Sequence, residues 1–544
     1  MDTDLRIPRP ENEAALNYAP GSRERGELIA KLTELKSQTF DIPLIIGGKE
    51  LRTGKTSDII IPHDNKKTLG KFYKAGAPEA QLAIDASNAA KASWERTPWR
   101  ERAAIFRKSA KLLTGPWRST LVAATMLGQS KNVQQSEADA VCELADHFRF
   151  NAYYLERLQT QQPPSTAGEK NSLEYRALEG FIFALTPFNF TSIAGNLPSA
   201  PALMGNTVLW KPASAAVLSA YYLMKLWQEA GLPDGVINML PGPVGEIGTH
   251  SIDSPDFAGL HFSGSTPVFN GFWTAVSRNL YKYKCYPRLV GETGGKGFIF
   301  AHTSCEPEAL KTAIIRGAYE FQGQKRASAS RAYIPRTLWD RIKDDLVAQI
   351  DDIKMGSSED FSCFMNAVID KAAYDRIKGH ISLAKKAADA TMLSGGRCDE
   401  TQGYFIRPTL IQTSDPLFKT MQEEILGPVM TVFVYEDDKY AETLKICDDT
   451  SPYGLTGSVF ALDKSAVSEA SAVLVNAAGN FYINDKPTGA VINRQPFGGH
   501  RASGTNDKVG WPDNLLRWTS VRAVKENLAP PTSYKYPFME EKKP

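Results

Sequence analysis

Hydrophobic positions in the first third of the chain recur at helical spacing. Four aliphatic residues between positions 28 and 35 cluster on one face of a 3.6-residue period, which predicts a helix within an N-terminal arm of residues 1–40. Residues 76–160 follow the same period in two amphipathic stretches that Pro98 separates. We therefore expect a mainly helical start, with the arm as an appendage rather than a domain.

The pattern changes from Phe181 onward. Short apolar runs such as "FIFAL" (181–185) and "AGLHF" (258–262) alternate with helical stretches such as residues 214–231. This alternation predicts right-handed βαβ units and a doubly wound parallel sheet, which binds ligands beyond its strand ends. A second alternating block covers residues 293–481, after a glycine-rich hinge at 291–297. The fold class expected is therefore α/β, with two doubly wound domains and a cleft between them.

Composition narrows the range of partners. The 544 residues include 63 Lys and Arg against 61 Asp and Glu, a net charge of +2, which favours neither nucleic acid nor a membrane surface as a partner. No apolar run approaches the roughly 20 residues of a membrane-spanning helix. Six scattered cysteines without a CxxC pair indicate neither a disulfide framework nor a zinc site, so no metal is expected. The opening residues show no signal or transit pattern, which favours a cytoplasmic location.

Two strand ends carry groups suited to a phosphate-bearing ligand. Gly264 and Ser265 stand between an apolar strand and a helix expected to begin near Thr266, and backbone amides at such a helix start attract phosphate. Lys211 ends another strand, where its ammonium could hold a ribose hydroxyl or a phosphate. The plainer alternatives are a simple N-cap for Ser265 and a solvated side chain for Lys211.

Two further polar residues suit catalysis. Asn189 follows the buried run 181–185, and its amide could stabilise a developing oxyanion, although a local Asx-turn is the alternative. Glu292 lies in the glycine-rich hinge and could act as a general base if burial raised its pKa. A surface carboxylate is its alternative role.

Taken together and in order, these motifs resemble the aldehyde dehydrogenase superfamily from about residue 40 to 530. Within that superfamily the chain is most similar to the pyrroline-5-carboxylate dehydrogenases, which oxidise glutamate γ-semialdehyde to glutamate. The motifs that carry the likeness are "TPFNF", "GNTVLWKP", "FSGS", "GETGGK", "EEILGPV", "YFIRPTLI", "NFYINDKPTGA" and "PFGGHRASGTNDK".

The resemblance implies a domain plan. Residues 41–150 and 182–292 would form a dinucleotide-binding domain, and residues 293–484 a catalytic domain. A β oligomerisation arm would comprise residues 151–181 and 505–535, which implies a homodimer or larger assembly. The implied cofactor is NAD or NADP, the implied substrate is a small amino-acid aldehyde or imine, and the mitochondrial matrix becomes an alternative location.

The resemblance also assigns roles by position. Asn189 matches the oxyanion donor and Glu292 the base that activates water. Gly264 belongs to the phosphate-binding motif, and the matched cofactor contacts are Lys211, Ser265 and Glu424. The matched substrate contacts are the backbone amides of Gly489 and Ala490, for the amino-acid carboxylate, and the aromatic walls Phe190 and Phe497.

One catalytic position departs from the family pattern. After "GQK" the family has a nucleophilic cysteine, and this chain has Arg326. A guanidinium stays protonated and has no lone pair available for attack, so it cannot form a thiohemiacetal. The nearest cysteines in the sequence are Cys305 and Cys363. Ser328 and Ser330 lie closer, but a serine nucleophile needs a base aimed at its hydroxyl.

Four smaller departures bear on the ligands. Leu426 occupies a position that the family gives to an aromatic residue beside the nicotinamide, and Ser214 one that often holds a ribose-binding acid. The loss of that acid leaves NADP as an alternative to NAD. His500 and Arg494 also differ from the family, and we expect Leu426, Arg494 and His500 to line or border the cleft. His500 could donate a proton, with an inert rim histidine as the alternative.

Three functions are compatible with this combination. The chain could be a nicotinamide-dependent oxidoreductase that uses an amino-acid semialdehyde or a cyclic imine without a thiohemiacetal. It could be a non-catalytic pseudoenzyme or oligomer partner, in which Arg326 forms an ion pair with Glu292. It could also be an ordinary NAD-dependent glutamate-semialdehyde dehydrogenase with an altered nucleophile.

Overall fold

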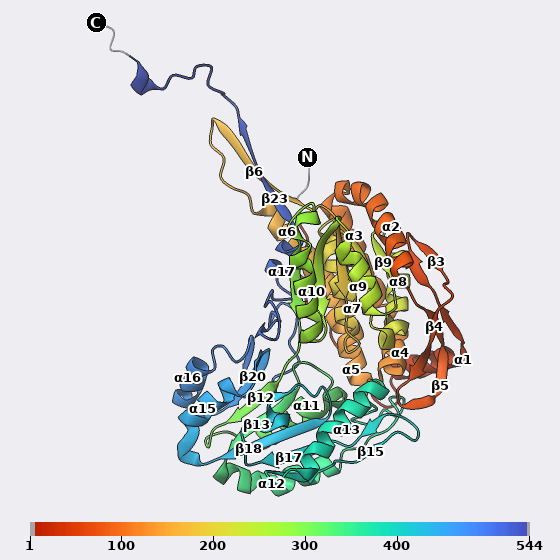
Figure 1. Cartoon of the computed structure of the whole chain (residues 1–544), viewed down its shortest axis with the longest axis vertical. Coiled ribbons are helices and arrows are strands. Elements are labelled where there is room, and N and C mark those ends of the chain that lie inside the picture. The colour runs from red at the N-terminus through yellow and green to blue at the C-terminus, as the bar shows by residue number, and fades with distance from the viewer. Residues whose placement is uncertain (1–5, 541–544) are drawn as a thin grey trace.

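The computed structural model describes residues 6–540, which fold into two lobes and a projecting arm (Figure 1). The first five residues of the predicted N-terminal arm lie outside this range. Helix α1 (Arg23–Ser37) begins at the N-cap Ser22, whose side chain accepts a hydrogen bond from the Arg25 amide. Its leucines at 28, 32 and 35 are buried, as their spacing predicts. The segment therefore packs against the first lobe as an appendage.

The first lobe contains a seven-stranded sheet in the order β11-β10-β7-β8-β9-β2-β3. Five of its strands are parallel, whereas β2 pairs antiparallel with both β9 and β3. The strands are β2 (Leu44–Ile46), β3 (Lys49–Leu51), β7 (Phe181–Leu185), β8 (Thr207–Lys211), β9 (Ile237–Met239), β10 (Phe257–Ser263) and β11 (Arg288–Glu292).

Helices cover both faces of this sheet because its strands are apolar on both sides. Phe181 and Phe183 of β7 pack toward one helix layer, and Ile182 and Ala184 pack toward the other. The first layer comprises α2 (Ala77–Arg96), α9 (Val244–Asp253) and α10 (Thr266–Arg278). The second comprises α3 (Trp99–Leu113), α4 (Arg118–Gln129), α6 (Leu144–Thr160), α7 (Thr191–Leu203) and α8 (Val217–Ala230). Short α5 (Val133–Glu137) and the π-helix η1 (Ala138–Glu143) join α4 to α6.

The second lobe repeats the plan with the strand order β14-β17-β18-β13-β12-β20-β21. Only its edge strand β14 runs antiparallel to its neighbour. The strands are β12 (Gly297–Ala301), β13 (Ala329–Pro335), β14 (Ala390–Ser394), β17 (Thr409–Thr413), β18 (Val429–Tyr435), β20 (Thr456–Phe460) and β21 (Asn480–Ile483). One face carries α11 (Pro307–Tyr319) and α12 (Arg336–Asp351), and the other carries α13 (Lys371–Lys386), α15 (Tyr440–Asp449) and α16 (Lys464–Val473).

The arm is a two-stranded antiparallel ribbon. Strand β6 (Glu169–Arg176) pairs along its whole length with β23 (Ser520–Asn527), and the ribbon projects beyond the first lobe (Figure 1). Smaller pieces complete the fold: a sheet of β1 (Phe40–Ile42), β5 (Asp64–Tyr73) and β4 (Thr56–Ile61), the pairs β15 (Cys398–Asp399) with β16 (Phe405–Ile406) and β19 (Tyr453–Gly454) with β22 (His500–Arg501), and the short helices α14 (Lys419–Gln422) and α17 (Pro512–Leu516).

The α/β class with two doubly wound sheets is confirmed, and so is the helix break at Pro98, between α2 and α3. The sheets are mixed rather than wholly parallel, because β2, β3 and β14 reach their places through connections that reverse direction. Within residues 6–540, no helix combines the length and the apolar character needed to cross a membrane. The same residues hold no cluster of three His, Cys, Asp or Glu side chains suited to a metal ion. The domain boundaries stay a prediction.

Candidate active site

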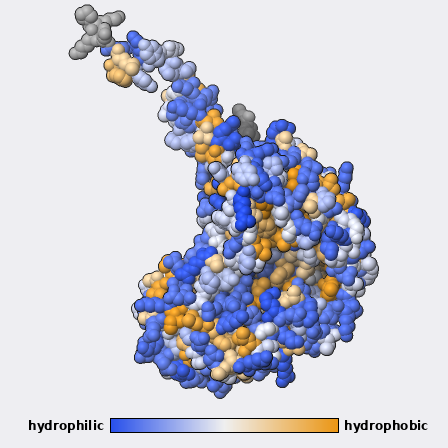
Figure 2. All heavy atoms as spheres, in the orientation of Figure 1, coloured by the Kyte–Doolittle hydropathy of each residue, from blue (hydrophilic) through white to orange (hydrophobic). Residues whose placement is uncertain are grey.

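A cavity of about 690 Å³ lies where the two lobes meet. Its wall takes residues from the π-helix η1, the start of α7, the end of β11, the loop before β13 and the loop around residue 490. Figure 2 shows the hollow between the lobes, with hydrophobic side chains on its floor. Both lobes therefore contribute side chains to a single site, as expected for two α/β domains that share a cleft.

Arg326 and Glu292 form an ion pair at the wall of this cavity. The Nη2 group of Arg326 donates a hydrogen bond of 2.6 Å to Oε2 of Glu292, and its Nη1 group donates one of 2.9 Å to the carbonyl of Thr293. Only 7% of the Arg326 side chain and 12% of the Glu292 side chain are exposed. Oε1 of Glu292 is buried and has no hydrogen-bond partner within residues 6–540. The predicted base is therefore engaged by the residue that replaces the expected nucleophile.

The loop that carries Arg326 is held from both lobes. Gln322, in a left-handed conformation (φ 55°), donates from Nε2 to the carbonyls of Ser130 and Ala367. The carbonyl of Gln324 accepts a 2.9 Å hydrogen bond from Nδ2 of Asn189. Because a side-chain conformation depends on its backbone, these contacts fix where the guanidinium points.

Asn189 does not form the Asx-turn that was its alternative prediction. Its Nδ2 group donates to the carbonyl of Gln324, 135 residues away, whereas Oδ1, the atom that accepts from the backbone in an Asx-turn, forms no such bond. Asn189 is buried, Oδ1 has no partner within the described chain, and the residue is absent from the cavity wall. It stands behind the Arg326 loop, so its role as an oxyanion donor stays a prediction.

A second group of predicted residues lies at the strand ends of the first sheet. Lys211, at the end of β8, is buried, and burial lowers its pKa to about 8. Among residues 6–540 no carboxylate lies within 4 Å of its ammonium. Ser265 is the N-cap residue of α10, yet its side chain makes no capping bond. A buried cation without a counter-ion, two strands from a helix N-terminus at the same edge of the sheet, fits an anionic ligand such as a dinucleotide phosphate.

Gly264, which is closely packed, and Glu424, a buried acid, also belong to this group of predicted cofactor residues. A Cβ added to Gly264 would lie 2.7 Å from the Phe262 ring, so a larger residue would displace that ring. Glu424 accepts a 2.8 Å hydrogen bond from the Gly295 amide, and burial raises the pKa of its carboxyl while Arg326 opposes that rise. Ser214 is exposed at the start of a 3₁₀ turn three residues after Lys211.

The ion pair borders the cavity, whereas the predicted cofactor residues lie outside the cavity wall. None of Lys211, Ser265 and Glu424 lines the cavity, whereas Glu292 and Arg326 do. Arg326 nevertheless acts electrostatically on Glu424. The pair therefore stands at the junction between the two regions that a hydride transfer would have to connect.

The four predicted substrate residues all line the cavity. They are Phe190, Gly489, Ala490 and Phe497. The backbone amides of Gly489 and Ala490 donate no hydrogen bond within residues 6–540, and Gly489 adopts φ 90°, which favours glycine. The loop thus presents two free donors, as a carboxylate site requires.

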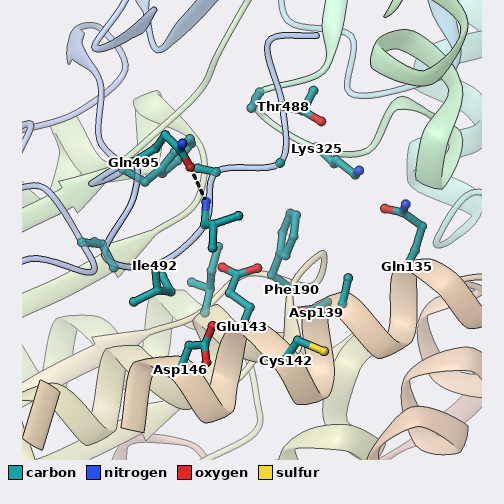
Figure 3. A pocket seen from close by; sticks show the side chains of 18 of the residues that line it. Gln135, Asp139, Cys142, Glu143, Asp146, Phe190, Lys325, Thr488, Ile492 and Gln495 are labelled. Carbon is teal, nitrogen blue, oxygen red and sulfur yellow. Dashed lines mark hydrogen bonds between the residues drawn. The ribbon is translucent and has the colours of Figure 1, made fainter. Parts of the chain in front are cut away.

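Three acidic residues of the cavity wall, Asp139, Glu143 and Asp146, lie opposite this loop, and the sequence analysis did not identify them. Figure 3 shows Asp139, Glu143 and Asp146 on the helical floor of the cavity, with Thr488 on the opposite side. Burial and the neighbouring Asp139 raise the pKa of Glu143 to about 8. Asp139 itself pairs with Lys131 at 2.5 Å and caps α7 by accepting from the amides of its first two residues. A local π-helix, which often marks a functional site, has no clear sequence signature.

A cysteine does line the cavity, contrary to the expectation from sequence proximity. Cys142 lies on η1, far from position 326 in sequence. Burial and Glu137 raise the pKa of its thiol to about 12, so it stays a thiol at neutral pH. Cys142 is therefore no substitute for the missing nucleophile.

The structure also disfavours Ser328 and Ser330 as replacement nucleophiles. Neither Ser328 nor Ser330 lines the cavity. The hydroxyl of Ser328 is buried without a partner in the described chain, and that of Ser330 accepts a 2.6 Å hydrogen bond from Nζ of buried Lys296. Glu292 is aimed at neither serine, because its carboxylate accepts its hydrogen bond from Arg326.

The prediction for Leu426, Arg494 and His500 is that they line or border the cleft, and Arg494 does border it through its contact with the wall residue Asn12. None of the three belongs to its wall. Arg494 is exposed and donates to Asn12 of the N-terminal segment, and His500 pairs with Gly454 in the β19–β22 ribbon. Burial lowers the pKa of His500, which disfavours the charged form that a proton donor needs. For Leu426 and His500, a position that borders the cleft stays a prediction.

The comparisons with known proteins agree with this geometry. The family model described as "Aldehyde dehydrogenase family" matches residues 50–524. The chain belongs to the aldehyde dehydrogenase family. A relative from Dictyostelium discoideum, "Delta-1-pyrroline-5-carboxylate dehydrogenase, mitochondrial", is 52% identical over 536 residues, which cover 98% of this chain and 96% of that protein. The human protein of the same name is 45% identical over 530 residues, covering 97% and 94%.

Solved structures of aldehyde dehydrogenase relatives give the same result. The Mycobacterium tuberculosis delta-pyrroline-5-carboxylate dehydrogenase bound with NAD has a TM-score of 0.96 and 47% identity, covering 99% of this chain and 100% of that one. A Thermus thermophilus 1-pyrroline-5-carboxylate dehydrogenase reaches a TM-score of 0.89 at 29% identity, covering 95% and 99%. The predicted resemblance to the aldehyde dehydrogenase superfamily, with the pyrroline-5-carboxylate dehydrogenases as its most similar branch, is confirmed.

Proposed function

We propose that this chain is a nicotinamide-dependent oxidoreductase that acts on an amino-acid semialdehyde, or on its cyclic imine, without forming a thiohemiacetal. The observation that carries the proposal is the ion pair of Arg326 and Glu292 at the expected nucleophile position, within a cavity that keeps the predicted substrate residues. The free amides of Gly489 and Ala490 suit a ligand carboxylate, and Glu143 suits a ligand ammonium.

The cofactor we propose is NAD, with NADP as the alternative. Lys211 and the N-terminus of α10 would hold its phosphate and ribose groups. The Mycobacterium tuberculosis relative is bound with NAD in its crystal structure, which supports that choice. Exposed Ser214 places no carboxylate beside Lys211, so a 2′-phosphate would meet no repulsion there. When bound, the nicotinamide supplies a hydride acceptor or donor.

The protein side of such a reaction needs no thiolate. A cyclic imine already has an electrophilic carbon, so hydride transfer requires only that the two reactants are held face to face. Arg326 would hold a negatively charged oxygen of the substrate, and Glu292 would relay a proton to the imine nitrogen as the imine carbon receives a hydride from a reduced nicotinamide. The proposed reaction therefore does not include the oxidation of an aldehyde through a thioester.

A non-catalytic role is the second candidate. The pair of Arg326 and Glu292 stands between the cavity and the predicted cofactor residues. A guanidinium fixed by two hydrogen bonds at that junction would keep a bound substrate away from the nicotinamide. The chain would then bind ligands, or pair with an active homologue, without turnover.

The nicotinamide absorbance separates the candidates. The purified chain and its Arg326→Cys variant are mixed with pyrroline-5-carboxylate and each of NAD⁺, NADP⁺, NADH and NADPH. A change of cofactor absorbance with the unmodified chain supports the oxidoreductase. If the absorbance does not change with the unmodified chain and only the cysteine variant reduces NAD⁺ or NADP⁺, the oxidoreductase is rejected. The remaining candidates are then the non-catalytic protein and an ordinary dehydrogenase with an altered nucleophile.

We also propose an assembly and a location. The ribbon of β6 and β23 would pair protomers into a homodimer or larger oligomer by adding strands at its open edges, which light scattering after gel filtration tests. The names of the Dictyostelium and human relatives place those proteins in mitochondria. We therefore propose a mitochondrial rather than a cytoplasmic location, which fractionation of the source cells tests.

A further inference from the structure

We infer that Asn12 is a positioning residue of the cavity, because it ties the loop of residues 488–495 to the floor helix α6. Asn12 belongs to the N-terminal strap, residues 7–18, a part of the segment that its sequence predicts to be an appendage. The inference rests on the proposed function only for the ligand that the loop receives. The tie itself needs no ligand, so it can be tested independently of turnover.

The side chain of Asn12 joins the floor helix to the loop. Its Nδ2 group donates a hydrogen bond of 2.7 Å to Oδ2 of Asp146 on α6 and one of 2.9 Å to the carbonyl of Ile492. Its Oδ1 atom accepts a 3.2 Å hydrogen bond from Nε of Arg494. Figure 3 shows Asp146 and Ile492 at the same end of the cavity. Both amide hydrogens and the amide oxygen of Asn12 are therefore used to connect the two sides.

The strap is fastened to the first lobe directly beside Asn12. The backbone amide of Glu13 donates a 2.8 Å hydrogen bond to Oδ1 of Asp146. The carboxylate of Glu13 pairs with Arg118 of α4 at 2.9 Å and with Arg149 of α6 at 2.7 Å, and only 17% of its side chain is exposed. Because the neighbouring residue is already fixed, Asn12 loses little additional freedom when it binds both the helix and the loop.

The strap is also a thin wall between two hollows. Asn12 and Glu13 line the cavity between the lobes, and they also line a surface groove of about 720 Å³ on the outer side. This groove leaves room for the strap to move outward. The position of Asn12 therefore depends on its hydrogen bonds rather than on packing from outside.

The loop has other anchors, which lie farther from its free amides. The side chain of Ile492 packs into the core of the first lobe, and the hydroxyl of Tyr154 donates a 2.8 Å hydrogen bond to Oδ1 of Asn493. Of the two side-chain hydrogen bonds that reach the loop from this side, that of Asn12 ends two residues after Ala490. Its loss should loosen the backbone at Ala490 without detaching the whole loop.

The tie requires an amide at position 12. Aspartate has the shape of asparagine, but an ionised carboxylate only accepts hydrogen bonds. In Asn12→Asp, an oxygen would face both the carboxylate of Asp146 and the carbonyl of Ile492, and like charges repel at this distance. In the swap Asn12→Asp/Asp146→Asn, the new amide can donate to position 12 and still accept from the amide of Glu13. The swap therefore restores the strap-to-helix bond with the two residue types exchanged.

Hydrogen–deuterium exchange of the unliganded full chain tests the inference. The measurement is made at pH 7.5, where Asp146 is ionised, since burial raises its pKa only to about 6. We expect peptides that cover residues 486–495 to exchange about fivefold faster in Asn12→Asp than in the unmodified chain. Asn12→Ala, which removes the donors without adding a charge, should show a smaller increase, and it decides the question if Asn12→Asp does not fold. The swap should move the rate back toward that of the unmodified chain.

Two controls separate this local effect from a general loss of stability. Asn17→Asp makes the same substitution at an exposed position of the strap, where Oδ1 accepts from the amide of Ala19 and a carboxylate can do the same. Its loop peptides should exchange at the unmodified rate. The buried strand β7, Phe181–Leu185, is the internal reference, and its exchange should stay the same in every variant.

The outcomes separate the inference from the proposed function. Unchanged loop exchange in the Asn12 variants, equal acceleration in Asn17→Asp or in β7, or no recovery in the swap overturns the role of Asn12. If the unmodified chain turns over pyrroline-5-carboxylate, Asn12→Asp should raise KM about fivefold and change kcat less than about twofold, and an unchanged KM also overturns that role. Absence of turnover by the unmodified chain rejects only the oxidoreductase, because loop exchange is measured without substrate.

Discussion

The guanidinium of Arg326 donates a 2.6 Å hydrogen bond to the carboxylate of Glu292 and thereby ties the two lobes together. Glu292 is the last residue of β11, at the edge of the first sheet, and Arg326 lies three residues before β13 of the second. The relationship is therefore both a contact between lobes and a change of chemistry at the expected nucleophile position. Its energetic and functional effects can be measured separately.

Removing both members of the pair should cost less stability than the two single removals added together. We expect Glu292→Gln to lower the free energy of unfolding by about 2 kcal/mol, because it leaves a largely buried guanidinium without its counter-charge. The double variant Arg326→Gln/Glu292→Gln should lose less than the sum of the two single variants. Urea unfolding measures these values. The exposed pair of Arg336 and Glu436 is the control, with an expected coupling below about 1 kcal/mol; additive effects at Arg326 and Glu292 would contradict the prediction.

Cofactor affinity should fall with rising pH because of Lys211. Burial lowers the pKa of this ammonium to about 8 in the empty site, and an anionic cofactor favours its charged form. The protonated fraction drops about tenfold between pH 7 and pH 9, so we expect a comparable weakening of NAD⁺ binding, measured by fluorescence titration. The Lys211→Met variant should bind NAD⁺ weakly at every pH. The Lys282→Met variant, which removes an exposed lysine, should show the same decrease of NAD⁺ affinity with pH as the unmodified chain. A flat profile in the unmodified chain would refute the role of Lys211.

Glu143 should make the empty protein less stable at alkaline pH. Its folded-state pKa is about 8, above the ordinary value of 4.5. The folded state therefore holds more protons than the unfolded state between these values, and stability falls as pH rises through that window. Between pH 6 and pH 9, the melting temperature should fall less for Glu143→Gln than for the unmodified chain. Glu526→Gln, at an exposed arm position, should behave like the unmodified chain; identical losses in all three would reject the assignment.

Gly489→Ala should weaken ligand binding more than it disturbs folding. The left-handed conformation of Gly489 (φ 90°) costs an alanine about 1 kcal/mol, and relief of that strain would turn the free amides of the loop away. We expect the affinity for the amino-acid ligand to fall about fivefold, by calorimetry. Gly271→Ala is the matched control, because no atom lies within 4 Å of the added Cβ in helix α10. Equal affinities of the two variants would count against the loop as a carboxylate site.

The sequence predicts the elements whose signal is local. Runs such as β7 and helices such as α8 follow directly from hydrophobic spacing, and the motif positions bring Phe190, Gly489 and Phe497 to one cavity as expected. The possible pair of Arg326 and Glu292 was also predictable from their family positions. These features depend on short stretches or on a motif, so an isolated sequence contains them.

The three acidic residues of the cavity wall and the true surroundings of position 326 were not predictable in the same way. Glu143 sits on a π-helix, whose one-residue widening of the turn alters which side chains face the cavity. Cys142 lies in the same wall although Cys305 and Cys363 are much closer to Arg326 in sequence. His500 follows a family motif, yet pairing with Gly454 turns it away from the cavity. In each case a contact between distant segments decides the outcome.

The ribbon of β6 and β23 also constrains how this protein can be made. Glu169 pairs with Asn527, so the ribbon joins two segments that lie more than 300 residues apart in the sequence. A ribosome that has released 500 residues has already completed all strands of both large sheets, while β6 still has both edges open. Until β23 has left the ribosome, the open edges of β6 can pair with a strand of a chaperone or of a neighbouring nascent chain.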